Sequence, residues 1–193
     1  MTTPTPRPDH PARSWPAETL LPAQGVRLAL FDVDGVLTDG GLYLDENGEP
    51  IKRFHVLDGQ GLRLLQDAGL TVAVISGRDS PALRARLHSL GIAPAHIRLG
   101  VGNKLPAAQA LLAALGLDWA QVAVIGDDWP DLPLLARAAF ACAPPQAHPE
   151  ALARVHYITR AAGGQGAARE FCDLLLTAGG HYRRMLAQAL QLP

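Results

Sequence analysis

Alternating short apolar runs and amphipathic segments constrain the fold of this chain more than any other feature. The apolar runs cover residues 26–33, 71–76, 96–100, 121–127 and 139–144, and the amphipathic segments between them cover 58–69, 80–91, 103–116 and 130–138. Strands that are apolar at nearly every position and are separated by helices are typical of a parallel sheet covered on both faces. The pattern predicts an α/β fold with a doubly wound, Rossmann-like parallel sheet.

Length and charge limit the partners of such a domain. The chain has 193 residues and a net charge of −1, with 17 Lys and Arg against 18 Asp and Glu. This length suits one domain with a sizeable core, and the balanced charge offers no basic surface to nucleic acid or anionic lipid. No apolar run reaches the ~18 residues of a membrane span. We therefore expect a cytoplasmic domain that acts on a small molecule, without a nucleic-acid or membrane partner.

The two ends of the chain differ from its middle. Prolines recur at positions 4, 6, 8, 11, 16 and 22, and this region lacks the continuous apolar core of a signal peptide. We expect residues 1–25 to form a flexible proline-rich arm, residues 26–180 to form the domain, and residues 181–193 to form a C-terminal tail helix.

Polar clusters stand where four of the predicted strands end, or shortly afterwards. In doubly wound sheets, ligands bind beyond the carboxyl ends of the strands. Taken singly, these residues also fit ordinary roles such as helix caps and turn formers. Their joint occurrence at equivalent strand ends favours one shared crevice. The residues are Asp32 and Asp34, then Ser76, Gly77 and Arg78, then Lys104, and finally Asp127, Asp128 and Asp131.

The residue types in this crevice indicate a chemistry. Converging carboxylates repel one another unless a hard cation neutralises them, and Mg2+ accepts one or two carboxylates together with water and a substrate phosphate. A lysine and a hydroxyl suit the phosphate, and an aspartate can attack phosphorus to form an aspartyl-phosphate. The cluster predicts Mg2+-dependent phosphoryl transfer. Neither common glycine-rich nucleotide-binding loop occurs in the sequence.

Four segments resemble, in order and spacing, the four motifs of the haloacid dehalogenase-like phosphatases. They are FDVDGVLTDG (31–40), ISGR (75–78), GNKLP (102–106) and VIGDDWPD (124–131). The longer stretches DVDGVLTDGGLY, GDDWPDLP and TRAAGGQGAAREFCDLLL look like the narrower group that hydrolyses 3-deoxy-D-manno-octulosonate 8-phosphate. The likeness extends from about Leu28 to about Leu176.

The resemblance implies roles for three aspartates. Asp32 would be the nucleophile that attacks phosphorus, with its second oxygen on Mg2+. Asp34 would protonate the leaving sugar alkoxide and then deprotonate the water that hydrolyses the aspartyl-phosphate, while its backbone carbonyl binds the metal. Asp127 would be the remaining carboxylate ligand of Mg2+.

The resemblance also implies how the phosphate is held. Ser76 and the Gly77 amide would donate hydrogen bonds to the phosphoryl oxygens, and Lys104 would neutralise them and orient the nucleophile. Asp128 and Asp131 would either bind the metal through water or hold Lys104 in place.

Substrate selection is expected to involve the segment after the first motif. Glu46-Asn47-Gly48 lies between GLYL and PIKRFHV, which is the pattern of a β-hairpin. In the family this hairpin stands in place of a large cap domain, and the resemblance implies a homotetramer in which hairpins meet and a neighbour's C-terminal segment covers the site. A solvated hairpin on a monomer is the alternative, but it leaves the apolar residues Leu42, Leu44, Ile51 and Phe54 poorly explained.

A glycine-rich segment near the C-terminus is a second candidate for substrate binding. Glycines 163, 164 and 166 allow close approach of the backbone to a ligand or a sharp turn into the next helix. Gln165 stands where the family more usually has arginine, so binding of a sugar carboxylate there is in question. Arg78, Arg160 and Arg169 are the other candidates for that contact.

These features together predict hydrolysis of 3-deoxy-D-manno-octulosonate 8-phosphate to the free sugar acid and phosphate, for lipopolysaccharide synthesis. A phosphatase for a nine-carbon sialic-type sugar 9-phosphate would use the same chemistry, although the S-G-R triplet at 76–78 favours the eight-carbon sugar. A non-catalytic oligomerisation domain is a further alternative. The complete set of polar residues argues against it.

Overall fold

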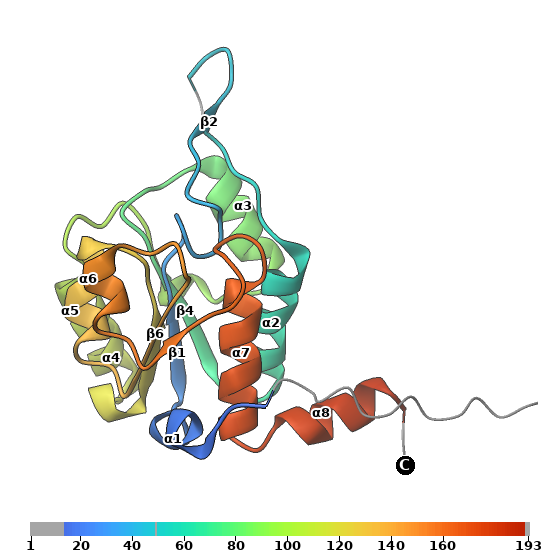
Figure 1. The fold of residues 1–193 in the computed structure, drawn as a ribbon. Helices are drawn as coiled ribbons and strands as arrows, with labels where there is room; N and C mark the ends of the chain where they lie inside the picture. The colour runs from blue at the N-terminus through green and yellow to red at the C-terminus, as the bar shows by residue number, and fades with distance from the viewer. Residues whose placement is uncertain (1–13, 49, 192–193) are drawn as a thin grey trace, which may run out of the picture.

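The computed structural model describes residues 14–48 and 50–191 and is built around one parallel sheet (Figure 1). The sheet has six strands in the order β5-β4-β1-β6-β7-β8, and every neighbouring pair is parallel. From β1 the chain adds strands on one side and then on the other, so the strand order reverses beside β1. The predicted doubly wound sheet is confirmed. The strands are β1 (Leu28–Phe31), β4 (Thr71–Ile75), β5 (Ile97–Arg98), β6 (Val122–Ile125), β7 (Phe140–Ala143) and β8 (Tyr157–Ile158).

Helices cover both faces of the sheet. One face carries α2 (Val56–Asp67), α3 (Pro81–Ser89) and α7 (Ala167–Ala178), and the other carries α4 (Lys104–Leu115), α5 (Leu132–Leu135) and α6 (Pro149–Leu152). Short 3-10 helices precede β5, β6 and α5: η2 (Pro94–His96), η3 (Trp119–Gln121) and η4 (Trp129–Asp131).

The sheet has a hydrophobic core on each side, which explains why its strands are apolar throughout. In β1, Ala29 and Phe31 face the core beneath α2, α3 and α7, whereas Leu28 and Leu30 face the core beneath α4, α5 and α6. All four residues are at most 1% exposed. Successive residues of a strand point to opposite faces, so a strand buried on both faces has no polar positions to alternate with.

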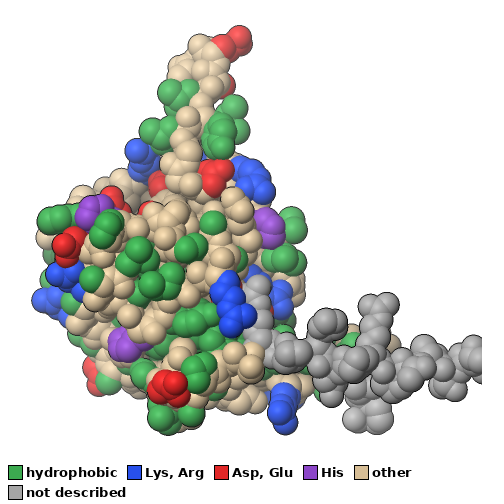
Figure 2. Space-filling view, viewed as in Figure 1, with side chains coloured by type: hydrophobic (Ala, Val, Ile, Leu, Met, Phe, Trp, Pro, Cys, Tyr) green, Lys and Arg blue, Asp and Glu red, His purple; other side chains and the backbone are tan. Residues whose placement is uncertain are grey.

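A small antiparallel hairpin follows β1 and projects from the carboxyl end of the sheet. Its strands are β2 (Tyr43–Leu44) and β3 (Pro50–Ile51), and Gly48 in the turn has a φ of +80°, a conformation that favours glycine. Figure 2 shows hydrophobic side chains along this hairpin, and Leu42, Leu44 and Ile51 are 61%, 61% and 57% exposed. The predicted hairpin insertion without a large cap domain is confirmed.

The ends of the described chain include two helical segments. Residues 14–25 were expected to belong to the flexible arm, but they form α1 (Ala17–Leu20) and the 3-10 helix η1 (Leu21–Ala23) and bury Trp15 against the core. The rest of that arm lies outside the described residues. α8 (Tyr182–Ala189) falls within the expected tail helix. Among the described helices, none combines the length and the apolar character that crossing a membrane requires.

Candidate active site

The polar clusters at the strand ends surround one cavity of about 350 Å³. Its lining includes every predicted site residue except Gln165 and the alternative carboxylate-binding candidates Arg160 and Arg169. The cavity lies beyond the carboxyl ends of β1, β4 and β6, where doubly wound sheets place their ligands. The lining residues are Asp32, Asp34, Ser76, Gly77, Arg78, Val101, Gly102, Lys104, Asp127, Asp128, Pro130 and Asp131.

Asp32 is held rigidly at the end of β1. Its backbone N–H donates to the carbonyl of Ile125 at 3.1 Å, which extends the pairing of β1 with β6. The side chain is only 8% exposed. A buried carboxylate is stable only when it is paired or hydrogen-bonded, so the partners of Asp32 decide its chemistry.

Lys104 is the main partner of Asp32. It is the first residue of α4, which begins there because the Asn103 side chain accepts the N–H of Leu105 at 3.2 Å. Its ammonium donates to Asp32 Oδ1 at 2.5 Å and to Asp131 Oδ1 at 2.6 Å. Burial alone would lower the pKa of Lys104, but the charges of the two aspartates outweigh burial and raise it. Lys104 is therefore a fixed positive charge.

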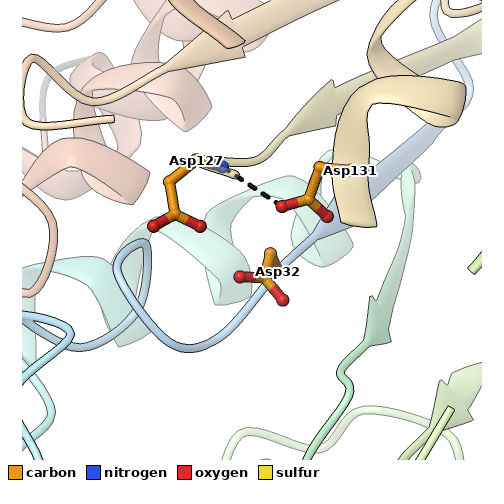
Figure 3. A group of neighbouring side chains, drawn as sticks. All are labelled: Asp32, Asp127 and Asp131. Carbon is orange, nitrogen blue, oxygen red and sulfur yellow. Dashed lines mark hydrogen bonds between the residues drawn. The ribbon is translucent and has the colours of Figure 1, made fainter. Parts of the chain in front are cut away.

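Asp127 completes a group of three carboxylates with Asp32 and Asp131 (Figure 3). One oxygen from each of the three lies within 4.8 Å of the others. Burial, followed by the charges of the other two aspartates, raises the pKa of Asp127 from 3.8 to about 8. Burial and the charge of Asp131 likewise raise the pKa of Asp32 to about 6, against the opposing effect of Lys104. The group needs more positive charge than one lysine supplies.

The donor set of this group fits a hard divalent cation. Asp131 is already engaged, because its Oδ1 accepts from Lys104 and its Oδ2 accepts the backbone N–H of Asp127 at 3.2 Å. Asp32 and Asp127 keep carboxylate oxygens for a metal. Two carboxylates, together with water and phosphate oxygens, form a typical Mg2+ environment. Of the two roles weighed for Asp131, the geometry favours holding Lys104.

Gly35 allows the loop after β1 to lie against Asp127. Its φ is +89°, and a methyl group at its Cα would overlap the Asp127 carboxylate. Glycine is needed here both for the backbone conformation and for the close approach. The G in the D-x-D-G part of the first motif is therefore explained by the geometry of the carboxylate group.

Ser76 and Gly77 form the opposite wall, after β4. Ser76 is 1% exposed, and its position is fixed because its N–H donates to the Arg98 carbonyl and its own carbonyl accepts from Val101. Its Oγ accepts the backbone N–H of Arg78 at 3.2 Å, which leaves the hydroxyl hydrogen to donate into the cavity. Gly77 also lines the cavity and is exposed.

Asp34 has a partner that was not identified from the sequence. Lys52, which follows β3 directly, donates a hydrogen bond to Asp34 Oδ1. The Lys52 side chain is 7% exposed, whereas that of Asp34 is 29% exposed. Arg78 lies on the other side, with its Nε 3.9 Å from Asp34 Oδ2. A sequence signal for Lys52 existed, because Lys52 and Lys104 are the only lysines of the chain.

The glycine-rich segment 163–166 supports the loop after β1. The N–H of Gly164 donates to the carbonyl of Val36 at 2.9 Å, and a methyl group on Gly163 would overlap the carbonyl of Gly35. The Gln146 side chain bridges the two segments, donating to the Gly35 carbonyl at 2.8 Å and accepting the Gly163 N–H at 3.2 Å. The close backbone approach expected of these glycines is made to another loop.

Only one of the residues proposed to bind a sugar carboxylate lies at the cavity. Arg78 lines the cavity, but Gln165 is exposed and lies outside its lining. Arg169 donates to Asp173 at 2.7 Å on its own helix, and Arg160 is anchored through its backbone N–H to Glu170. Arg78 is therefore the one member of this set at the site.

Comparison with known proteins agrees with the site. A family model described as haloacid dehalogenase-like hydrolase matches residues 97–171. The 3-deoxy-D-manno-octulosonate 8-phosphate phosphatase of Escherichia coli strain K12 is 41% identical over 174 residues, covering 90% of this chain and 92% of the relative. The chain belongs to the haloacid dehalogenase-like phosphatases and is a phosphoric monoester hydrolase.

The chain is also similar to two solved structures. The 3-deoxy-D-manno-octulosonate 8-phosphate phosphatase of Moraxella catarrhalis, in complex with magnesium, phosphate and KDO, has a TM-score of 0.85 and 37% identity, covering 89% of this chain and 97% of that one. The cobalt-bound deoxy-D-mannose-octulosonate 8-phosphate phosphatase of Haemophilus influenzae has a TM-score of 0.79 and 43% identity, covering 83% of this chain and 93% of that one. Both relatives hold a divalent metal.

Proposed function

We propose that this chain hydrolyses 3-deoxy-D-manno-octulosonate 8-phosphate to the free sugar acid and phosphate, with Mg2+ and through an aspartyl-phosphate, in lipopolysaccharide synthesis. The observation that carries the proposed chemistry is the buried Asp32 fixed by Lys104, with Asp34 on the same cavity. The substrate is inferred from the relatives and from the complex with magnesium, phosphate and KDO.

In the first half-reaction, a carboxylate oxygen of Asp32 attacks phosphorus. Lys104 fixes Oδ1 of this carboxylate, and burial removes the water that would weaken its nucleophilicity. As the bond between phosphorus and the sugar oxygen breaks, Asp34 gives its proton to that oxygen. The sugar leaves as a neutral alcohol and Asp34 is left ionised.

In the second half-reaction, the Asp34 carboxylate takes a proton from a water molecule that attacks the aspartyl-phosphate. The bond between Asp32 and phosphorus breaks, inorganic phosphate leaves, and Asp34 is protonated again. One residue thus serves as acid and then as base, which regenerates the starting state without an external buffer.

The remaining groups neutralise charge on the phosphoryl oxygens. The Ser76 hydroxyl and the Gly77 amide line the cavity and would donate hydrogen bonds to these oxygens, and the Lys104 ammonium would supply a fixed charge. Asp32, Asp127 and the backbone carbonyl of Asp34 would hold Mg2+, which when bound neutralises the carboxylates and the transferring group. Asp131 orients this set by binding Lys104, and Asp128 supports Asp131 because its backbone carbonyl accepts the N–H of Asp131 at 2.9 Å.

Assembly into a homotetramer is part of the proposal. The apolar side chains Leu42, Tyr43, Leu44 and Ile51 are all more than half exposed on the projecting hairpin. Large apolar side chains that are exposed together on one projecting element fit a contact with another chain. The cytoplasmic location and the contribution of a neighbour's tail stay predictions.

A substrate panel tests the proposed function. Purified protein with Mg2+ is assayed for phosphate release from the eight-carbon sugar acid phosphate, a nine-carbon sialic-type sugar 9-phosphate and neutral sugar phosphates. We expect the highest kcat/KM for the eight-carbon substrate. Background rates on every sugar acid phosphate would refute the proposed substrate, and a preference for the nine-carbon compound would replace it.

A further inference from the structure

Lysine is used at only two positions in this chain, and each lysine binds an aspartate that follows β1. Of the 17 Lys and Arg residues, 15 are arginine, and the two lysines are Lys52 and Lys104. Lys104 donates to Asp32 and Lys52 donates to Asp34. An ammonium is a compact point charge, whereas a guanidinium is a broad planar fork. An ammonium therefore fits beside each of these carboxylates in less space than a guanidinium needs.

The Lys52 side chain is more buried than the lysine of an ordinary surface ion pair. Its side chain is 7% exposed and lies between the hairpin and the segment after β4. Burying an ammonium costs several kcal/mol unless a carboxylate compensates it. Because Lys52 follows β3 directly, the hairpin fixes the position of its ammonium relative to Asp34.

The two oxygens of Asp34 have different surroundings. Oδ1 accepts the hydrogen bond from Lys52. Oδ2 lies 3.9 Å from Arg78 Nε, which is beyond hydrogen-bonding distance, so among the described residues it keeps its lone pairs free. One oxygen of the carboxyl group is therefore anchored, and the other is available to carry a proton.

We propose that Lys52 is a positioning residue for proton transfer by Asp34 in the first half-reaction. Lys52 fixes Oδ1 and so aims Oδ2 at the leaving-group oxygen, and its charge stabilises the negative charge that develops on Asp34 as the proton departs. The proton on Oδ2 moves to the sugar oxygen while the bond from that oxygen to phosphorus breaks and the bond from Asp32 to phosphorus forms. This inference rests on the proposed function of the site.

The proposal predicts a dependence on the leaving group. A sugar alkoxide is a poor leaving group and needs the proton from Asp34, whereas p-nitrophenolate leaves without one. The parameter kcat/KM reports only the steps up to the first irreversible one, which is departure of the leaving group. Loss of Lys52 is therefore expected to reduce kcat/KM for the sugar phosphate and to spare kcat/KM for p-nitrophenyl phosphate.

The test compares Lys52→Met with a neighbouring control, Arg53→Met. Methionine keeps the length of the lysine stem without its charge. Arg53 belongs to the same segment but donates to the carbonyl of Gly164 at 3.3 Å, not to Asp34. Since general acid catalysis contributes about 10²–10⁴-fold, we expect Lys52→Met to lower kcat/KM for the sugar phosphate by about 10–100-fold and for the aryl phosphate by less than about threefold. In Arg53→Met, the ratio of kcat/KM for the sugar phosphate to kcat/KM for the aryl phosphate should stay within about twofold of the wild-type ratio.

A double-mutant cycle with Asp34→Asn separates positioning from direct contact with the sugar. If Lys52 acts through Asp34, adding Lys52→Met to Asp34→Asn should change kcat/KM for the sugar phosphate by less than about twofold. If Lys52→Met lowers kcat/KM for the sugar phosphate by the same factor in the wild type and in Asp34→Asn, Lys52 binds the substrate directly and the proposal is overturned. If Lys52→Met lowers kcat/KM by the same factor for the sugar phosphate and for p-nitrophenyl phosphate, the role of Lys52 is merely structural and the proposal is also overturned.

Failure of the proposed function gives a different result. A wild-type enzyme that hydrolyses p-nitrophenyl phosphate but not the eight-carbon sugar phosphate would refute that substrate alone. The alkyl phosphate that the wild type hydrolyses fastest then replaces it in the comparison. A Lys52→Met variant with an unchanged ratio between alkyl and aryl phosphates would overturn the positioning role whatever the natural substrate is.

Discussion

Substitution of Gly35 by alanine tests the proposed metal site through a residue that carries no functional group. Gly35 has a φ of +89°, and an added methyl group would overlap the Asp127 carboxylate. The left-handed conformation alone costs a non-glycine residue roughly 1–2 kcal/mol. The overlap should also weaken metal binding, because the Asp127 carboxylate must move away from the position in which it faces Asp32.

Gly69 provides a matched control for the first of these effects. Its φ is +88°, and a methyl group there would meet nothing within 4 Å. Gly69→Ala should therefore lose about 1–2 kcal/mol of unfolding free energy and leave metal binding unchanged. Gly35→Ala should lose at least as much stability and also about 10–100-fold in Mg2+ affinity, the range found when the surroundings of metal ligands are disturbed.

Two measurements separate these outcomes. Chemical denaturation in the presence of a chelator gives the stability of each variant, and titration calorimetry gives its Mg2+ affinity. A Gly35→Ala variant that is destabilised like Gly69→Ala but binds Mg2+ as well as the wild type does would refute the assignment of Asp127 as a ligand.

Three further predictions follow from the same geometry. Asp131→Asn removes one of the two carboxylates that hold Lys104, and we expect kcat to fall about tenfold or more while far-UV circular dichroism is unchanged; an unchanged kcat would contradict the positioning role. The pKa of Asp127 is raised to about 8 and that of Asp32 to about 6, so the folded state binds more protons than the unfolded state above pH 3.8. With a chelator present, the unfolding free energy should therefore decrease from about pH 4 to pH 8, and added Mg2+ should oppose this decrease. A chelated protein whose stability rises across that range would contradict the raised pKa values. Truncation after Ala178 removes α8 and should change KM or kcat if a neighbour's tail covers the site, whereas identical kinetics would exclude that cover.

The fold was predictable because its main signal is local. Each residue of β1 faces one of two hydrophobic cores, so the strand is apolar throughout, and the segments between strands carry helical patterns and caps such as Asn103. The two-residue strand β8 was not predicted, since a pair of residues carries no periodicity. Trp15 was placed in a flexible arm because the surrounding prolines are a local signal, whereas its burial depends on a hydrophobic core formed by residues that are distant in the sequence.

The cavity was predictable for a topological reason. Parallel strands bring their carboxyl ends to one edge, so residues as distant in sequence as Asp32 and Lys104 could be expected to meet. The contact of Lys52 with Asp34 was not predictable in this way, because it depends on how the hairpin returns toward the sheet. The segment containing Gly163 and Gly164 was identified as a place of close approach, but sequence could not show that the approaching group is the loop after β1.

The central claim is that Asp32 is the nucleophile, and trapping the phosphorylated enzyme tests it most directly. In Asp34→Asn the base for the second half-reaction is removed, while p-nitrophenyl phosphate needs no acid for the first. Mixing this variant with Mg2+ and p-nitrophenyl phosphate, followed by acid quenching, proteolysis and mass spectrometry, should show one phosphoryl group on Asp32. Release of p-nitrophenolate by a variant whose Asp32 stays unmodified at every time point would contradict the account.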